Sequence, residues 1–283
     1  MLLGNDHLKR PSVPIISDRD EVVSIDVFSV PGPDLAELAG RAAETLAEIA
    51  IEDRDFIAGA THASLPALQQ PLFWLPGAVP LRRRFVAVYG RWRAGGHRAG
   101  LAGSAAGRAL LRALAPDSPE AAAVLADPAA SLYRPALLDV SGDDASLHWP
   151  GPVIEPGGGQ AQFINIFRTT PDRQARLLEA TSAIMPVATR HPGYLRTALH
   201  LSLDGYKLAN YGQYRSVAQI RAMYFHAETA RRFGSILFQD VTEPAVIFGR
   251  SWSWRGRPIG TTPRLRCYDV VSTALRQDLR QGD

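Results

Sequence analysis

One expected strand carries an amide and aromatic rings at a spacing that could hold a flat, polar aromatic molecule. Asn210 and Tyr214 are four residues apart, so they share one face of the strand, whereas Tyr211 points to the other face. The amide can hydrogen-bond to a carbonyl or a phenol, and the ring can stack on an aromatic ligand. Strands are depleted in asparagine, so Asn210 favours a binding function, while Tyr214 is equally compatible with core packing.

The other reactive residue types form no catalytic or metal-binding pattern. The histidines show no H-x-x-x-H or H-E-x-x-H spacing, which argues against a metal site. The single cysteine, Cys267, cannot form an internal disulfide bond or a thiolate zinc site. No G-x-G-x-x-G loop lies between a strand and a helix, and no G-x-S-x-G motif occurs. We therefore expect no metal and no tightly bound cofactor.

Composition narrows the class of protein and its partners. The chain has 283 residues, of which 46% are hydrophobic, and a formal net charge of only +3, which is less basic than is usual for a nucleic-acid-binding protein. No run of apolar residues is long enough to span a membrane. The first 20 residues lack the charged and apolar regions of a secretion signal. These features predict a soluble, cytoplasmic protein that binds neither nucleic acid nor a membrane.

The two halves of the chain repeat each other. Residues 24–30 (SIDVFSV) match residues 163–169 (FINIFRT), with Phe28 and Phe167 at the same place. Residues 56–65 match residues 194–203, and residues 85–93 match residues 207–215. The equivalent pairs in these two segments are His62 and His200, Val88 and Asn210, Tyr89 and Tyr211, and Trp92 and Tyr214. The constant spacing is interrupted by one insertion near 66–81, which is rich in proline and apolar residues.

Each repeat is expected to fold as one β-α-β-β-α-β unit, which is the ferredoxin-like order. The units cover residues 21–141 and 160–275, with helices expected over 33–49, 97–114, 171–188 and 217–233 and closing strands near 132–140 and 264–272. A single unit leaves one face of its sheet uncovered, whereas two units can pack sheet against sheet. The sequence therefore predicts an α+β fold with two ferredoxin-like repeats in an intramolecular pseudo-dimeric α/β barrel. The monomer is then a fused dimer, and further pairing of chains is left open.

Three motifs of the second half follow one another in a recognisable order. Residues 192–194 read PGY, residues 200–205 read HLSLDG, and residues 210–214 read NYGQY. Through these motifs the chain resembles the antibiotic biosynthesis monooxygenase family, whose pattern has PG[YF], H-x-S-x-D-G and N-Y-x-x-W. Tyr214 replaces the tryptophan of the last motif, and in the first half Val88 stands at the place of its asparagine. The tandem form resembles the ring-cleaving oxygenases of angucycline pathways.

The resemblance implies a metal-independent monooxygenase of antibiotic biosynthesis. Its substrate would be a polycyclic aromatic polyketide, and its reaction hydroxylation, quinone formation or C–C ring cleavage. Molecular oxygen would be a substrate. The ring-cleaving branch also implies reduced flavin (FADH2 or FMNH2) as a cosubstrate, with a flavin reductase as partner.

The resemblance also implies roles for individual residues. Asn210 would hold a substrate oxygen, and His200 would accept a proton, although a strand position by itself favours a structural histidine. Substrate-binding roles fall to the aromatic residues Tyr214, Trp92, Trp74 and Phe167. His62 and Tyr211 would form a hydrogen bond between the halves that supports the pocket. Because valine at 88 cannot hydrogen-bond and the segment near 66–81 can cover the first pocket, chemistry is expected mainly in the second half.

Two other classes of function remain compatible with the sequence. One is a non-redox cyclase or another tailoring enzyme on the same scaffold, since a fold does not fix its chemistry. The other is a non-catalytic ligand-binding protein. Oxygen uptake with a polyphenolic substrate would distinguish an oxygenase from the non-redox enzyme. Tight binding of a ligand without turnover would favour the binding protein.

Overall fold

The computed structural model describes residues 13–14, 20–31, 34–65, 83–94, 99–140, 153–157, 159–229, 231–232 and 266–276. The inserted segment near 66–81, with Trp74, lies outside the described residues. The expected cover of the first pocket by this segment therefore stays a prediction, as do the domain boundaries.

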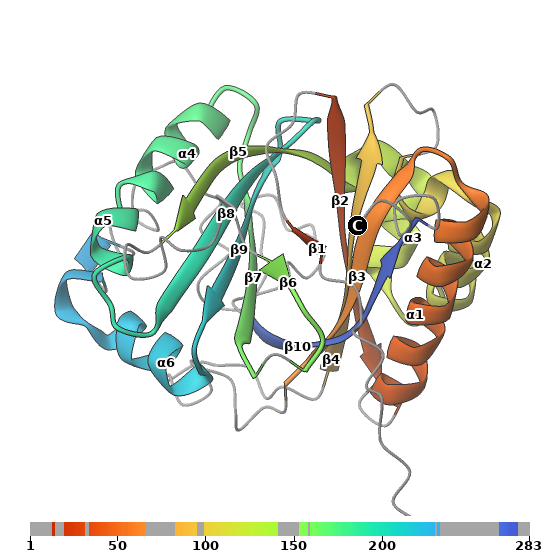
Figure 1. Ribbon diagram of the computed structural model, residues 1–283. Helices are drawn as coiled ribbons and strands as arrows, with labels where there is room; N and C mark the ends of the chain where they lie inside the picture. Colours follow the sequence, from red (N-terminus) through yellow and green to blue (C-terminus); the bar gives the residue numbers. More distant parts are fainter. Residues whose placement is uncertain are drawn as a thin grey trace, which may run out of the picture.

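A closed barrel of eight antiparallel strands forms the centre of the molecule (Figure 1). The strands are β2 (Glu21–Pro31), β3 (Phe56–Ser64), β4 (Arg83–Arg93), β5 (Leu132–Val140), β7 (Ala161–Arg168), β8 (Tyr194–Ser202), β9 (Lys207–Tyr214) and β10 (Arg266–Leu275). They follow the order β10-β3-β4-β2-β5-β8-β9-β7 around the barrel. A separate two-stranded ladder joins β1 (Val13–Pro14) to β6 (Val153–Ile154). The predicted α+β class is confirmed.

Strand order and register are the same in both halves of the barrel. The first half contributes β5-β2-β4-β3 and the second half β10-β7-β9-β8, so the last strand lies beside the first in each. Asp26 pairs with Val88 between β2 and β4, and Asn165 pairs with Asn210 between β7 and β9. The barrel closes because β5 also pairs with β8 and β10 also pairs with β3.

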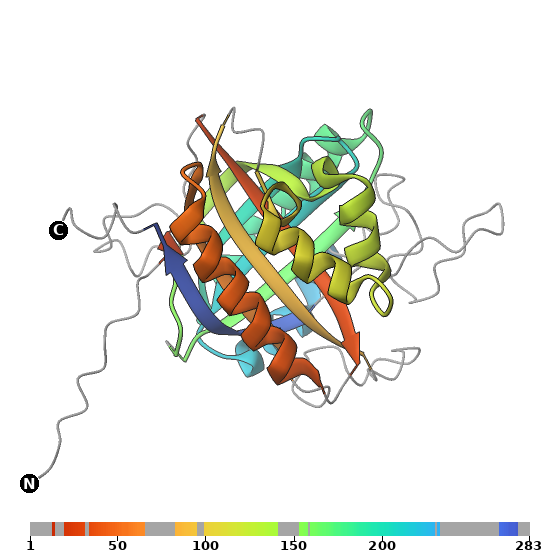
Figure 2. The ribbon, with the colours of Figure 1, turned by 90° about the vertical axis from the view of Figure 1, so that its right-hand side faces the viewer.

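The helices lie on opposite sides of the barrel, as Figures 1 and 2 show. The first half is covered by α1 (Leu35–Glu52), α2 (Ala105–Leu114) and α3 (Pro119–Ala126), with short 3-10 turns η3 (Leu101–Gly103) and η4 (Pro128–Ser131). The second half is covered by α4 (Gln174–Ser182), α5 (Met185–Ala188) and α6 (Val217–Phe225). No helix among the described residues is both long and apolar enough to cross a membrane.

Helix boundaries differ from the sequence-based expectations at several places: the helix expected over 171–188 is two helices, α4 and α5, and α1 extends beyond residue 49 to Glu52. The expected helix over 97–114 begins only with α2, because Ser104 accepts a hydrogen bond from the Gly107 N–H and caps the helix there. The expected start at Pro171 is also wrong, since residues 171–173 form a turn and α4 begins at Gln174. Finally, α6 ends at Phe225 and not at residue 233, because the next residue, His226, adopts an extended conformation.

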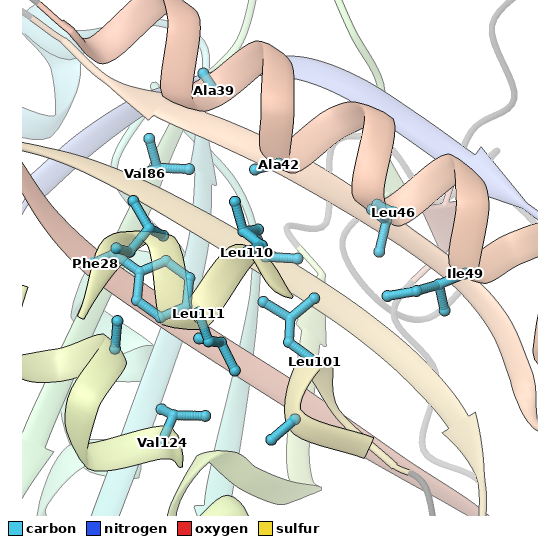
Figure 3. Close-up of a cluster of buried hydrophobic side chains, with 14 of the residues drawn as sticks. Phe28, Ala39, Ala42, Leu46, Ile49, Val86, Leu101, Leu110, Leu111 and Val124 are labelled. Carbon is cyan, nitrogen blue, oxygen red and sulfur yellow. The ribbon is translucent and has the colours of Figure 1, made fainter. Parts of the chain in front are cut away.

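The alternation of side chains along the strands separates two cores. Inside the barrel, Ile25, Tyr89, Ile164 and Tyr211 belong to one buried cluster. Outside it, the strands of the first half and their helices share a single cluster that runs from Phe28 to Val124 (Figure 3). In the second half the corresponding layer is divided into two smaller clusters. This division is where the candidate site lies.

Candidate functional site

A cavity of about 20 Å³ lies between the outer face of the second half of the sheet and its helices. Its floor comes from β7, β8 and β9, and its cover from the end of α4, from α5 and from α6. The lining residues are Phe163, Thr181, Ile184, Met185, Ala188, Thr197, Asn210, Tyr214 and Met223. This volume holds roughly one water molecule. The cavity bridges the two divided clusters, since Phe163, Met185 and Tyr214 belong to one and Ile184 to the other.

Asn210 is the polar group of the floor. It lies in β9 between Asn165 of β7 and Leu199 of β8, and its side chain faces the helices. The amide oxygen Oδ1 is buried and has no hydrogen-bond partner among the described residues. An unmatched buried acceptor costs about 1–3 kcal/mol of stability, so a donor brought by a ligand would be bound favourably there.

The remainder of the lining is aromatic, aliphatic or hydroxylic. Tyr214 is buried and packs edge-on against Tyr194, with 5.6 Å between ring centroids. The Thr181 hydroxyl donates to the Leu177 carbonyl at 2.7 Å, which leaves the Thr197 hydroxyl and the Asn210 amide as the polar groups of the floor. No lining residue is charged at neutral pH. The arrangement can therefore orient a neutral aromatic molecule by one or two hydrogen bonds.

His200, the predicted proton acceptor, does not line this cavity. Register pairs His200 with Ala209 and Leu199 with Asn210, so the histidine points into the barrel. There its Nε2 lies 3.3 Å from the Tyr89 hydroxyl. Burial lowers the pKa of His200 to about 4, so the ring is neutral at pH 7. A neutral imidazole inside the barrel has no access to a ligand bound at Asn210.

His62 and Tyr211 meet inside the barrel and join the two halves. His62 Nε2, from β3, lies 2.9 Å from the Tyr211 hydroxyl of β9. The same hydroxyl donates to Gln162 Oε1 at 3.1 Å. Burial lowers the pKa of His62 to about 4, so this histidine is also neutral. Because Tyr211 follows Asn210 in β9, the hydrogen bonds behind the strand fix the backbone that carries the amide.

The other aromatic candidates lie away from the cavity. Trp92 is buried under α1, where its ring packs edge-on against Phe56 and its Nε1–H donates to Ser24 Oγ at 3.0 Å. Phe167 packs in the cluster of the second half that lies farther along β7. These contacts are those of core residues, so neither ring is placed for stacking on a ligand at Asn210. Of the predicted site residues that the structure describes, only Asn210 and Tyr214 lie together at the cavity.

Sequence reasoning missed most of the lining. Phe163 and Thr197 could have been found from the period of two, because they share the outer face with Asn165 and with Leu199. Thr181, Ile184, Met185 and Ala188 recur at the helical period and are expected to face the sheet, but this period does not show which sheet residues they cover. In the described part of the chain, no group of three or more His, Cys, Asp or Glu side chains could hold a metal ion.

Comparison with known proteins gives one sequence relative and a shared fold. No family model matches the chain. It is 32% identical over 97 residues to a tetracenomycin F1 monooxygenase of Streptomyces glaucescens, a match that spans 34% of this chain and 85% of that protein. Among solved structures, an anthrone oxidase-like protein has a similar fold, with a TM-score of 0.57 and 16% identity. That similarity covers 94% of this chain and 97% of the other.

Proposed function

The chain belongs to the antibiotic biosynthesis monooxygenase family, and on this basis we propose that it is an oxygenase that tailors a polycyclic aromatic polyketide at the cavity of the second half. The observation that carries the proposal is the Asn210 amide oxygen, which is buried in an uncharged cavity and has no hydrogen-bond partner in the described part of the chain. A phenolic hydroxyl of such a substrate would donate to it. The aromatic ring would then lie against Tyr214 and Phe163.

The size of the cavity requires that its cover move when a ligand binds. A cavity that accepts benzene is on the order of 150 Å³, whereas this one is about 20 Å³. Met185 and Met223 both line it, and methionine side chains adapt more easily than branched or aromatic ones. Binding of an aromatic ligand would therefore displace these side chains or the helices that carry them.

The proposed chemistry can be balanced without a metal. Oxidation of a ring CH2 group to a carbonyl releases four electrons, and these reduce O2 to one inserted oxygen atom and one water molecule. An electron-rich phenol whose hydroxyl donates to Asn210 Oδ1 can give an electron and that proton to O2. The protein would contribute a dry cavity, a fixed orientation, the acceptor oxygen of Asn210 and the hydroxyl of Thr197. Quinone formation fits this balance, whereas hydroxylation of an aromatic C–H needs two electrons from an added reductant.

The described lining does not fit a flavin nucleotide. A flavin carries a phosphate, and no lysine or arginine lines the cavity. Hydroxylation or C–C ring cleavage with reduced flavin from a reductase would therefore need a flavin that acts from outside this cavity. Addition of reduced FMN to the assay decides between these alternatives.

We further propose that residues 21–141 and 160–275 are two copies of one ferredoxin-like unit, arranged as a pseudo-dimer. The identical strand order and the matching register of Asp26–Val88 and Asn165–Asn210 support this. Each closing strand also pairs with a strand of the other half, β5 with β8 and β10 with β3. Two separate subunits that dimerise through their sheets would pair in the same way.

Oxygen uptake with 1,8-dihydroxyanthrone tests the proposed function. We expect one O2 consumed per molecule oxidised, without added reductant and with no loss of rate after treatment with a chelator. A rate that depends on reduced FMN would favour the flavin-assisted alternative. Binding of the anthrone without oxygen uptake would contradict the oxygenase and favour a binding protein. Conversion under anaerobic conditions would favour a non-redox enzyme.

A further inference from the structure

The helical residues that cover the cavity show which part of the helix layer must move to open it. The covering side chains are Thr181, Ile184, Met185, Ala188 and Met223. All but Met223 lie within one turn of the junction between α4 and α5. A ligand therefore reaches Asn210 most directly if this junction moves away from the sheet.

The junction is a break in the helical hydrogen bonding that Pro186 imposes. Proline has no N–H, so Pro186 cannot donate to the carbonyl of Ser182 four residues earlier. The next N–H, of Val187, donates to the Ile184 carbonyl at 2.9 Å and not to the carbonyl of Ala183. Ala183 is thus left with a carbonyl that the helix itself does not use, as at a helix end.

Arg232 binds this carbonyl from outside the helix. Its Nη1–H donates to Ala183 O at 2.8 Å. Its Nε and Nη2 donate to Glu228 Oε1 at 3.2 and 3.0 Å. Arg232 and Glu228 lie four residues apart in helical stretches that follow α6. A guanidinium is rigid and planar, so the ion pair with Glu228 through Nε and Nη2 orients Nη1 toward the break.

We propose that Arg232, oriented by Glu228, is a latch that holds the α4–α5 junction over the cavity and sets how often the cavity opens. Arg232 does not line the cavity, so it is a positioning residue and changes access to Asn210 without changing the groups that meet the ligand. The role of the latch in ligand entry rests on the proposed function. Its effect on the mobility of the junction does not.

Amide hydrogen exchange of the free protein tests the latch without a ligand. In Arg232→Ala we expect exchange at Ile184, Met185, Val187 and Ala188 to become about three- to tenfold faster, because a half-exposed, charge-assisted hydrogen bond is lost. The association rate of 1-naphthol, a bicyclic phenol, should rise in the same variant, measured by stopped-flow fluorescence. Arg232→Lys should lie between the two, because lysine can reach the carbonyl but lacks the planar geometry.

Arg176→Ala is the matched control, since Arg176 is an exposed arginine of α4 outside the cavity lining. It should change neither measurement. Unchanged exchange at the junction in Arg232→Ala, or an equal increase in Arg176→Ala, overturns the latch. Faster exchange with an unchanged association rate overturns only its role in ligand entry. If the unaltered protein does not bind 1-naphthol, the proposed cavity function fails, while the exchange data still decide on the latch.

Discussion

Above the equivalent positions Val88 and Asn210, the helix-facing side of the barrel is packed in the first half and holds a cavity in the second, although the strands beneath have the same register. The larger cavity of the first half, about 200 Å³, lies elsewhere, between the end of β2, α1 and α2. In the first half, a Cβ atom on Gly59 would lie 3.0 Å from the Leu46 side chain, and one on Gly90 would lie 2.8 Å from Trp92 Nε1. These glycines let Leu46 and Trp92 reach the sheet backbone, and the core above is continuous (Figure 3).

In the second half the equivalent floor carries larger or more polar side chains. Thr197 takes the place of Gly59, Phe163 that of Ser24, and Asn210 that of Val88. The cover differs as well, because α1 is one unbroken helix of 18 residues whereas α4 and α5 are separated at Ala183 and Ile184. At this position of the sheet, the cavity of the second half therefore coincides with a polar floor and with a break in the covering helix.

The largest expected effect tests how tightly the first half is packed. Trp92→Ala should lower the free energy of unfolding by about 3–5 kcal/mol, because it leaves a hole in a continuous core and removes the donor to Ser24. Tyr214→Ala should cost less, since that ring already borders a cavity and has fewer neighbouring atoms on that side. Denaturant unfolding of both variants measures the difference. An equal or larger loss in Tyr214→Ala would show that the second half is packed as tightly as the first.

The next prediction concerns Asp26, whose place in the second half is taken by the neutral Asn165. Neither carboxyl oxygen of Asp26 has a hydrogen-bond partner among the described residues, and the nearby Ser131 hydroxyl donates to the Pro128 carbonyl. Burial raises the pKa of Asp26 from 3.8 to about 7, against smaller lowering effects of Ser131 and Lys207. The folded state therefore holds this proton more tightly than the unfolded state, so the stability contributed by Asp26 is complete below pH 3.8 and is lost as the pH rises to about 7.

Asp26→Asn removes this dependence. A shift of about three units corresponds to about 4 kcal/mol, so the variant should gain roughly that much on the parent protein between pH 4 and pH 8. His62 and His200, whose pKa values are lowered, act in the opposite direction in both proteins and cancel in the difference. Denaturant unfolding across this pH range measures it. A stability difference that does not change with pH would mean that Asp26 ionises normally.

These examples show what the sequence could predict and what it could not. The period of two placed Asn210 and Tyr214 on one face and Tyr211 on the other, because alternation in a strand is a local property. The face on which His200 lies relative to Asn210 was not predicted, since it depends on the register between β8 and β9, which the turn between them sets. The surroundings of Trp92 were not predicted either, because they come from Ser24 of β2 and Phe56 of β3. The partner of the helix break at Pro186 could not be predicted either. The free carbonyl of Ala183 is bound by Arg232, which is 46 residues from Pro186 in the sequence.

The third prediction asks which half does the chemistry. Asn210→Leu removes the hydrogen bond to the substrate oxygen and should lower the rate of oxygen uptake with 1,8-dihydroxyanthrone by about 10²-fold or more. Val88→Ala, at the equivalent position of the first half, should have a much smaller effect because valine makes no hydrogen bond. A variant at Val88 that is more damaging than Asn210→Leu would place the working site in the first half.

The smallest expected effect concerns two tyrosine–histidine pairs inside the barrel. Tyr89 follows Val88 in β4 and pairs with His200, and Tyr211 follows Asn210 in β9 and pairs with His62. The Tyr211 hydroxyl has two partners, His62 at 2.9 Å and Gln162 at 3.1 Å, whereas the Tyr89 hydroxyl has His200 alone at 3.3 Å. Tyr211→Phe leaves two buried polar groups unmatched and should cost about 1–3 kcal/mol, while Tyr89→Phe should cost about 1 kcal/mol.

Activity separates a positioning role from a merely structural one. Tyr211 lies directly behind Asn210, so Tyr211→Phe should slow oxygen uptake at saturating 1,8-dihydroxyanthrone under conditions in which the variant is fully folded. Tyr89 lies behind Val88, so Tyr89→Phe should leave that rate unchanged. Because a misplaced amide weakens a hydrogen bond without removing it, the loss in Tyr211→Phe should be smaller than in Asn210→Leu.

Combining the two changes should add little to the loss in Asn210→Leu alone, since the tyrosine acts through the amide. Independent, multiplying losses in the double variant would show that the inner hydrogen bonds support the second half in some other way than by holding Asn210.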